Sequence, residues 1–201
     1  MEGKVYTKSY DPPAYDRKEI LRYAGVRAPG EEIGKLMESC LEELAGRISC
    51  KVCYAEFPVR VEDGELDLGF AKVRSADLRK NLAGCESIVL FAATVGLEID
   101  RLIARYARLE PSRAFLFQAI GAERIESLCN LFNREVNAEK GKLGSGTRPR
   151  FSPGYGDLEL TVQRDIFRVL DCPRKIGLTL NETCLMSPTK SVTALIGVYR
   201  I

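Results

Sequence analysis

The chain has 201 residues, of which 45% are hydrophobic, so it can bury one sizeable core and is too short for two large domains. Its 30 basic and 28 acidic residues are interspersed and leave a formal net charge of +2, which excludes the broad basic field that nucleic-acid binding requires. The first residues lack the apolar core of a signal peptide and the longest clean apolar run, residues 88–93, is too short for a membrane span, so we expect a cytoplasmic protein without a membrane partner.

The N-terminal part of the chain predicts an irregular arm and two helices. Residues 1–15 include two successive prolines and are predicted to form the arm. Asp16 is a suitable N-cap for a short helix that Gly25 ends. Residues 31–47 carry apolar side chains at helical spacing, with acidic residues early and a basic residue late, as the helix dipole favours.

From residue 49 the apolar pattern becomes that of strands. Residues 52–61 lead through Asp63-Gly64 into a second apolar segment, which predicts a β-hairpin with its turn at Asp-Gly. Ser75 is a capping residue for a short helix. Residues 87–96 are almost continuously apolar, which predicts a strand buried on both faces in the middle of the sheet.

Two helices follow, over residues 97–107 and 111–139, and the second has a proline at its start. At 100° per residue, Glu126 falls within the apolar stripe of the second helix, whereas Glu123 lies at the margin and Arg124 points away. A buried unpaired carboxylate is costly, so Glu126 is predicted to meet either a core arginine or the ammonium or hydroxyl group of a ligand. The apolar members of the stripe are Phe115, Ala119, Ala122, Cys129 and Val136.

The remaining chain predicts a loop, a helix and two strands. Residues 140–149 are rich in glycine and are predicted to form a mobile loop, whose spacing does not match a phosphate-binding P-loop. Residues 158–170 predict a helix, and residues 178–186 and 191–199 predict strands. This mixed order favours an α+β fold, with a central antiparallel or mixed sheet and flanking helices.

Cysteine and histidine usage narrows the chemistry. The seven cysteines form an odd, scattered set, which indicates reduced thiols. Cys50 and Cys53 could form a redox pair or half a metal site, but residues three apart on a strand point to opposite faces, which favours ordinary packing. Histidine is absent, so the commonest general base and metal ligand are missing, and we expect no metal site in this chain.

The six residues Arg150-Phe-Ser-Pro-Gly-Tyr155 combine a charge, a turn and an aromatic ring. Pro153 fixes φ and Gly154 can adopt a positive φ, so the chain can turn sharply and direct the guanidinium and the phenol into one cavity. A guanidinium fork suits a carboxylate or phosphate, and the ring offers a flat surface for a base or an apolar chain. The segment predicts a site for a small anionic ligand, with a plain surface turn as the alternative.

Further along, residues 176–192 read Ile-Gly-Leu-Thr-Leu-Asn-Glu-Thr-Cys-Leu-Met-Ser-Pro-Thr-Lys-Ser-Val. In this order the two segments resemble the C-terminal half of the activation domain of cobalamin-dependent methionine synthase. That family carries Arg-x-x-Pro-Gly-Tyr, followed by Gly-x-x-Leu-x-Glu-Ser-x-x-Met-x-Pro-x-x-Ser-Val. The match covers roughly residues 120–198, and residues 16–23 resemble the start of free-standing relatives of that domain.

The resemblance implies a single domain over residues 1–201 that binds S-adenosylmethionine and presents its methyl group to cob(I)alamin during reductive reactivation. It implies that the partner is a cobalamin-dependent methionine synthase, or another corrinoid protein, that lacks its own activation domain, together with a flavodoxin-type reductant. Because the chain has no histidine and no room for folate, homocysteine or corrinoid domains, cobalamin is expected on another protein. Methyl transfer needs alignment rather than an acid or base, so no catalytic residue is expected.

The resemblance also implies the ligand contacts. Arg150 is expected to bind the ligand's carboxylate, Tyr155 to pack beside the ligand, and Glu126 to bind the ammonium. Backbone groups of Phe151–Gly154 are expected to bind the remaining polar atoms. Glu126 matches the family's ligand-contacting glutamate if one residue is deleted between helix and loop, and Ser127 matches without that deletion.

Three departures from the family pattern leave an alternative open. Gly156-Asp157 stand where the full-length enzymes have proline, a terminal segment with a further tyrosine does not follow Ile201, and an acidic contact from the N-terminal part has no visible counterpart. The alternative is a non-catalytic module that docks on a corrinoid methyltransferase without binding S-adenosylmethionine. A third hypothesis is a thiol redox protein that uses Cys50 and Cys53.

Overall fold

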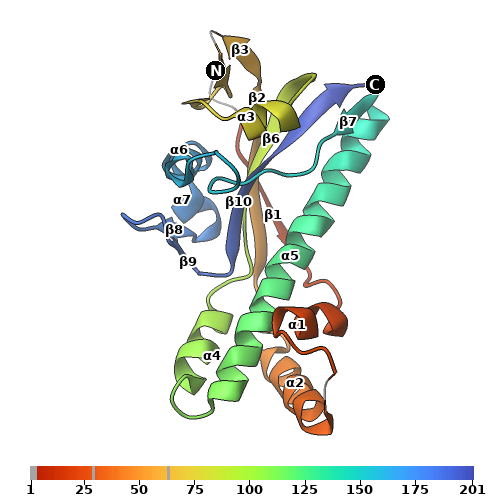
Figure 1. The fold of residues 1–201 in the computed structure, drawn as a ribbon, viewed down its shortest axis with the longest axis vertical. Helices are drawn as coiled ribbons and strands as arrows, with labels where there is room; N and C mark the ends of the chain where they lie inside the picture. Colours follow the sequence, from red (N-terminus) through yellow and green to blue (C-terminus); the bar gives the residue numbers. More distant parts are fainter. Residues whose placement is uncertain (1–3, 29, 63) are drawn as a thin grey trace.

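A five-stranded antiparallel sheet forms the centre of the protein, seen in a computed structural model that describes residues 4–28, 30–62 and 64–201 (Figure 1). The strand order is β1-β2-β6-β10-β7, and every neighbouring pair is antiparallel. The predicted α+β fold around an antiparallel sheet is therefore confirmed. The strands are β1 (Tyr6–Tyr10), β2 (Cys50–Pro58), β6 (Cys85–Thr94), β7 (Ser145–Thr147) and β10 (Ser191–Arg200).

Strand β6 lies in the middle of the sheet, as its apolar sequence predicts. It pairs with β2 on one side and β10 on the other, and its residues from Ile88 to Thr94 are all buried. Alternate side chains enter two separate cores, because successive residues of a strand point to opposite faces. Phe91 belongs to the first core, whereas Leu90 and Ala92 belong to the second.

The first face of the sheet is covered by α5 (Pro111–Lys142), which runs along much of the molecule (Figure 1). Three shorter helices gather around its N-terminal half and complete the first core. They are α1 (Arg17–Tyr23), α2 (Glu31–Leu44) and α4 (Glu98–Tyr106).

The second face carries shorter elements that pack over the second core. They are α3 (Ala76–Asn81), a 3-10 turn (Leu160–Val162), α6 (Gln163–Leu170), α7 (Cys172–Ile176) and two small sheets. The first small sheet contains the predicted hairpin, in which Glu62 pairs with Glu65, while Asp63 lies outside the described residues. The small-sheet strands are β3 (Arg60–Glu62), β4 (Glu65–Asp67), β5 (Lys72–Val73), β8 (Thr179–Leu180) and β9 (Met186–Ser187).

Three predicted helix starts are confirmed, whereas the helix predicted over residues 158–170 begins as a 3-10 turn at Leu160 and becomes α-helical at Gln163. Asp16 accepts hydrogen bonds from N–H groups in the first turn of α1, and Ser75 accepts one from Leu78 at the start of α3. Pro111 occupies the first turn of α5. Local capping chemistry therefore fixes where these helices begin.

The predicted irregular arm, residues 1–15, is wrong over Tyr6–Tyr10, which form the edge strand β1. These residues pair in antiparallel register with Cys50–Tyr54 of β2, and Tyr6 stacks on Tyr54 with ring centroids 5.4 Å apart. The tertiary pairing supplies hydrogen bonds and aromatic contacts that the short segment does not reveal by itself.

The predicted mobile loop at residues 140–149 is also wrong as a description of the backbone. Helix α5 continues to Lys142, Gly144 turns the chain with φ of +74°, and β7 then pairs with the end of β10. Gly146 lies against the ring of Tyr199, where a β-carbon would clash. The glycines serve a tight turn and a close approach rather than mobility.

The predicted strand at residues 178–186 is instead the β8–β9 hairpin. The Asn181 side chain accepts hydrogen bonds from the N–H groups of Thr183 and Leu185, at 3.0 and 2.9 Å, and Cys184 adopts a positive φ of 62°. The asparagine therefore turns the chain where apolar composition predicts a continuous strand. Within the described parts of the chain, no helix combines the length and the apolar content that crossing a membrane requires.

Candidate functional site

Arg150 points toward α5, which holds its guanidinium with three side chains. Nη2 forms an ion pair with Oε2 of Glu126, and Nη1 donates to Oδ1 of Asn130 at 2.8 Å. Nη1 also donates to Oδ1 of Asn133 at 3.0 Å, in the amide orientation that lets Asn133 donate to the carbonyl of Cys129. The three acceptors lie at positions i, i+4 and i+7 of α5, so one helix face supplies all of them.

Both charged groups of this pair remain partly accessible. The Arg150 side chain is 21% exposed and the Glu126 side chain is 38% exposed. Glu126 therefore finds its cation in the loop arginine, not in an arginine of the core. A ligand that carries both charges could reach both groups.

The backbone of the Arg150–Tyr155 segment is largely hydrogen-bonded within the protein. Phe151 exchanges two hydrogen bonds of 2.9 Å with Leu195 of β10, and its ring is buried in the second core. Gly154 has the predicted positive φ, +85°, and its N–H donates to the carbonyl of Leu158 at 2.8 Å. In this segment the N–H groups of Arg150 and Ser152 make no hydrogen bond to the described chain. The N–H groups of Phe151 and Gly154, which were expected to bind the ligand, are therefore already used in hydrogen bonds within the protein.

Tyr155 does not join Arg150. Its ring is 69% exposed and packs edge-on against Phe151, with ring centroids 5.4 Å apart and an interplanar angle of 82°. Phe151, which directly follows Arg150, pairs with Leu195 of β10 as in an antiparallel sheet, so the side chains of these two successive residues point to opposite sides. The Tyr155 ring packs on Phe151 and therefore lies on the side away from Arg150. Tyr155 lines a cleft of about 490 Å³ that does not include Arg150; its lining residues are Asp77, Lys80, Asn81, Arg148, Pro149, Phe151, Tyr155 and Gly156. The structure thus does not show the predicted shared cavity.

Asp157 fastens the end of this loop to α3. Its carboxylate accepts hydrogen bonds from the Ser75 hydroxyl, from the N–H of Ala76 at 2.6 Å and from the N–H of Asp77 at 3.2 Å. The Ser75 hydroxyl and the N–H of Ala76 hold the pKa of the Asp157 carboxyl below its usual value. This anchor gives a structural role to one of the residues that depart from the family pattern.

We expect Asp157→Asn to lower stability at neutral pH and to have no effect in strong acid. Because the folded pKa is lowered, the carboxylate stabilises the fold above its usual pKa of 3.8, and this contribution is lost as the pH falls through the folded pKa. Urea unfolding of both proteins at several pH values measures the difference, which should shrink below about pH 4. A difference that stays constant down to pH 2 would show that the Asp157 carboxylate does not carry the effect.

Comparison with known proteins identifies the family. Residues 76–199 match the family model described as vitamin B12 dependent methionine synthase, activation domain. The chain belongs to this family. The fold is similar to that in a crystal structure of the MetH reactivation domain bound to AdoHcy, with a TM-score of 0.68 and 15% sequence identity over 98% of this chain and 78% of that chain. No curated protein sequence matches the chain.

In this activation domain the two segments that resemble the family pattern, residues 150–155 (the first motif) and residues 176–192 (the second motif), meet at β10. Within residues 186–192, the Ser191 hydroxyl donates to the carbonyl of Pro188 at 2.8 Å and bonds Thr94 of β6 at 2.9 Å. These bonds fix the start of β10, the strand whose Leu195 pairs with Phe151 of the first motif. The second motif therefore helps to position the loop that carries Arg150.

The deeply buried acid of the activation domain is Glu123, and the prediction that Glu126 points into the core is wrong. Glu123 is 1% exposed and Arg124 is 0% exposed, and the two side chains form an ion pair. Arg124 also donates to the backbone carbonyls of Pro13 and Ala14. Helix α5 is covered on two sides, by the sheet and by the segment that leads into α1, so a single-stripe pattern misses its second buried face.

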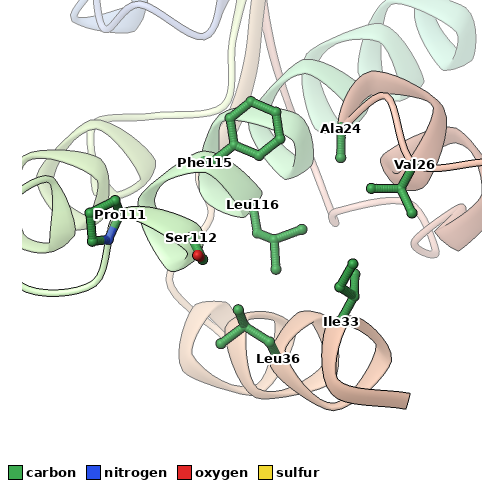
Figure 2. Close-up of a pocket in the computed structure, with 8 residues that line it drawn as sticks. All are labelled: Ala24, Val26, Ile33, Leu36, Pro111, Ser112, Phe115 and Leu116. Atoms are coloured by element: carbon green, nitrogen blue, oxygen red, sulfur yellow. The ribbon is translucent and has the colours of Figure 1, made fainter. Parts of the chain in front are cut away.

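Phe115 was also expected in the core but is 55% exposed, because it borders an open pocket at the helical end of the activation domain. Figure 2 shows this apolar pocket, of about 520 Å³, between α1, α2 and the start of α5. None of the predicted ligand residues lies there. Its lining residues are Ala24, Val26, Ile33, Leu36, Pro111, Ser112, Phe115 and Leu116.

The cysteines of the activation domain pack as predicted from strand geometry. Cys50 enters the first core and Cys53 the second, so their sulfurs lie on opposite faces of β2. The Sγ atom of Cys53 instead lies 3.9 Å from that of Cys172, and both thiols are free. Burial raises the pKa of Cys50 to about 11, which keeps this thiol protonated and weakly nucleophilic. This arrangement favours packing over the redox hypothesis.

Proposed function

We propose that this activation domain binds S-adenosylmethionine and presents its methyl group to cob(I)alamin held by a separate corrinoid protein. The observation that carries this proposal is the accessible Arg150–Glu126 ion pair, located at the motif that resembles the family's ligand-binding segment. The fold neighbour was crystallised with AdoHcy, the compound that remains when S-adenosylmethionine has given up its methyl group.

A zwitterionic amino-acid tail fits this ion pair. Its carboxylate can bind Arg150 while its ammonium binds Glu126, so one internal charge pair is replaced by two pairs with the ligand. Tyr155 lies apart from Arg150, so its exposed ring can serve the nucleoside end of the ligand but not the amino-acid tail, and the N–H of Ser152 can donate to a remaining polar atom. The chain's role in this proposal is to bind and orient the ligand.

The reaction needs no acid or base from this chain. The partner's cob(I)alamin would supply a strongly nucleophilic cobalt that accepts the sulfonium methyl, and S-adenosylhomocysteine would remain. The chain contributes alignment of the sulfonium toward the partner. The proposed partner is a cobalamin-dependent methionine synthase, or another corrinoid protein, that lacks an activation domain of its own, with a flavodoxin-type reductant.

A reactivation assay tests this function. A cobalamin-dependent methionine synthase from which the activation domain has been removed is inactivated by oxidation and incubated with a reductant, S-adenosylmethionine and this protein. We expect the recovery rate to rise with added protein and to require S-adenosylmethionine. Recovery that is no faster with the protein than without it would reject the proposed function for that partner.

One observation favours a second candidate function, a docking module that does not bind S-adenosylmethionine. Arg150 and Glu126 satisfy each other in the structure, and Tyr155 lies apart from them. A pull-down with the same truncated enzyme separates the candidates, because the docking module would bind the enzyme with unchanged affinity when S-adenosylmethionine is present.

A further inference from the structure

Arg150 makes one charged and two neutral contacts with α5. The charged acceptor is Glu126, and the two neutral acceptors are the amide oxygens of Asn130 and Asn133, both of which bind Nη1. Neutral amides hold a guanidinium without neutralising its charge. If Glu126 is drawn to a ligand's ammonium, Arg150 stays in place and keeps its full charge for an anion.

The hydrogen-bond donors of Arg150 are unevenly used. A guanidinium has five N–H donors, and the two on Nη1 and one on Nη2 have acceptors on α5. Nε and the second hydrogen of Nη2 make no hydrogen bond to the described chain. In the described chain, the buried side-chain nitrogen and oxygen atoms that lack a hydrogen-bond partner belong to Asn81, Arg148, Gln163 and Thr193. Nε of Arg150 also lacks a partner but is not among these buried atoms, so it is accessible from outside the protein.

Nε and Nη2 flank one edge of the planar guanidinium, and this edge matches the two oxygens of a carboxylate. The opposite nitrogen, Nη1, is fixed by both asparagines. The asparagines therefore determine which edge of Arg150 is left for a ligand.

We propose that Asn130 and Asn133 are positioning residues that turn the Nε–Nη2 edge of Arg150 toward the carboxylate of the bound ligand. This role rests on the proposed binding of S-adenosylmethionine. It also makes the pair a specificity device, because ligands with an α-carboxylate gain from the fixed edge and ligands without one do not.

Calorimetric titration with two compounds tests the proposal. S-adenosylhomocysteine carries the amino-acid tail, and 5′-methylthioadenosine has the same nucleoside and sulfur but no tail. We expect the double variant Asn130→Ala/Asn133→Ala to bind S-adenosylhomocysteine about tenfold more weakly, the value of about one hydrogen bond to a charged group. Its affinity for 5′-methylthioadenosine should not change. Far-ultraviolet circular dichroism checks the fold, and the single variants replace the double variant if it does not fold.

Asn137→Ala is the matched control. Asn137 lies one turn beyond Asn133 on α5, and it accepts a hydrogen bond from the Thr147 hydroxyl at 2.9 Å, not from Arg150. Its removal should leave the affinities for both compounds unchanged.

Three results would overturn the inference. Unchanged affinity of the double variant for S-adenosylhomocysteine, while the wild type binds it, would reject the positioning role alone. An equal loss for both compounds would show general damage to α5 and would reject it as well. Failure of the wild-type protein to bind S-adenosylhomocysteine would reject the proposed function and this inference together.

Discussion

Replacing Arg124 with alanine is expected to lower the free energy of unfolding by about 3–5 kcal/mol. Arg124 is fully buried and pairs with Glu123, so its removal leaves a buried carboxylate without its counter-ion. The carbonyls of Pro13 and Ala14 lose their donors at the same time, and the segment that enters α1 loses its attachment to α5. Urea unfolding of the wild type and the variant measures the loss.

Arg134→Ala is the control for this prediction, because Arg134 lies on the same helix and is exposed. Exposed substitutions away from such contacts usually change stability by no more than about 0.5 kcal/mol. If Arg124→Ala is no more destabilising than Arg134→Ala, the buried ion pair does not hold the N-terminal segment.

Replacing Arg150 with alanine is expected to weaken binding of S-adenosylmethionine by about 2–5 kcal/mol, the cost of breaking a partly buried pair between the ligand's carboxylate and the protein. The variant lacks the guanidinium that would bind the ligand's carboxylate, and Glu126 loses its cation. Arg150→Lys should lose less affinity, because it keeps the charge but not the bidentate geometry. Calorimetric titration of each protein with S-adenosylmethionine measures the effect.

The control is again Arg134→Ala, which is expected to bind the ligand as the wild type does. Equal affinities of the wild type and Arg150→Ala would show that this arginine does not bind the carboxylate. A check of thermal unfolding separates lost binding from lost folding.

Several features could be predicted from sequence because local chemistry determines them. The caps at Asp16 and Ser75 and the continuous apolar run of β6 each leave a pattern within a few residues. The family resemblance, carried by the motifs around residues 150–155 and 176–192, is confirmed by the match over residues 76–199. The inference that Cys50 and Cys53 point to opposite faces followed from strand geometry and is also confirmed.

Other features depend on contacts between distant segments. The burial of Glu123 and Arg124 arises from the segment at residues 13–16, which covers a face of α5 that periodicity assigns to solvent. The divergence of Arg150 and Tyr155 arises from the pairing of Phe151 with Leu195, which is remote in sequence. Tertiary contacts of this kind override a local pattern.

Asn130 and Asn133 were missed for a simpler reason. Polar residues on a helix surface are usually solvated, and nothing in a single sequence shows that two of them face an arginine seventeen or more positions away. Their spacing from Glu126, at i+4 and i+7, is the signal that could have placed them on its face once Arg150 was assigned to that acid.

A crystal structure of the protein soaked with S-adenosylmethionine is the most direct measurement of whether this site binds the ligand. We predict that the methionine carboxylate lies on the Nε–Nη2 edge of Arg150 and that the ammonium lies on Glu126, with the pair between these two side chains opened. Ligand density at another position, with the Arg150–Glu126 pair intact, would contradict the account.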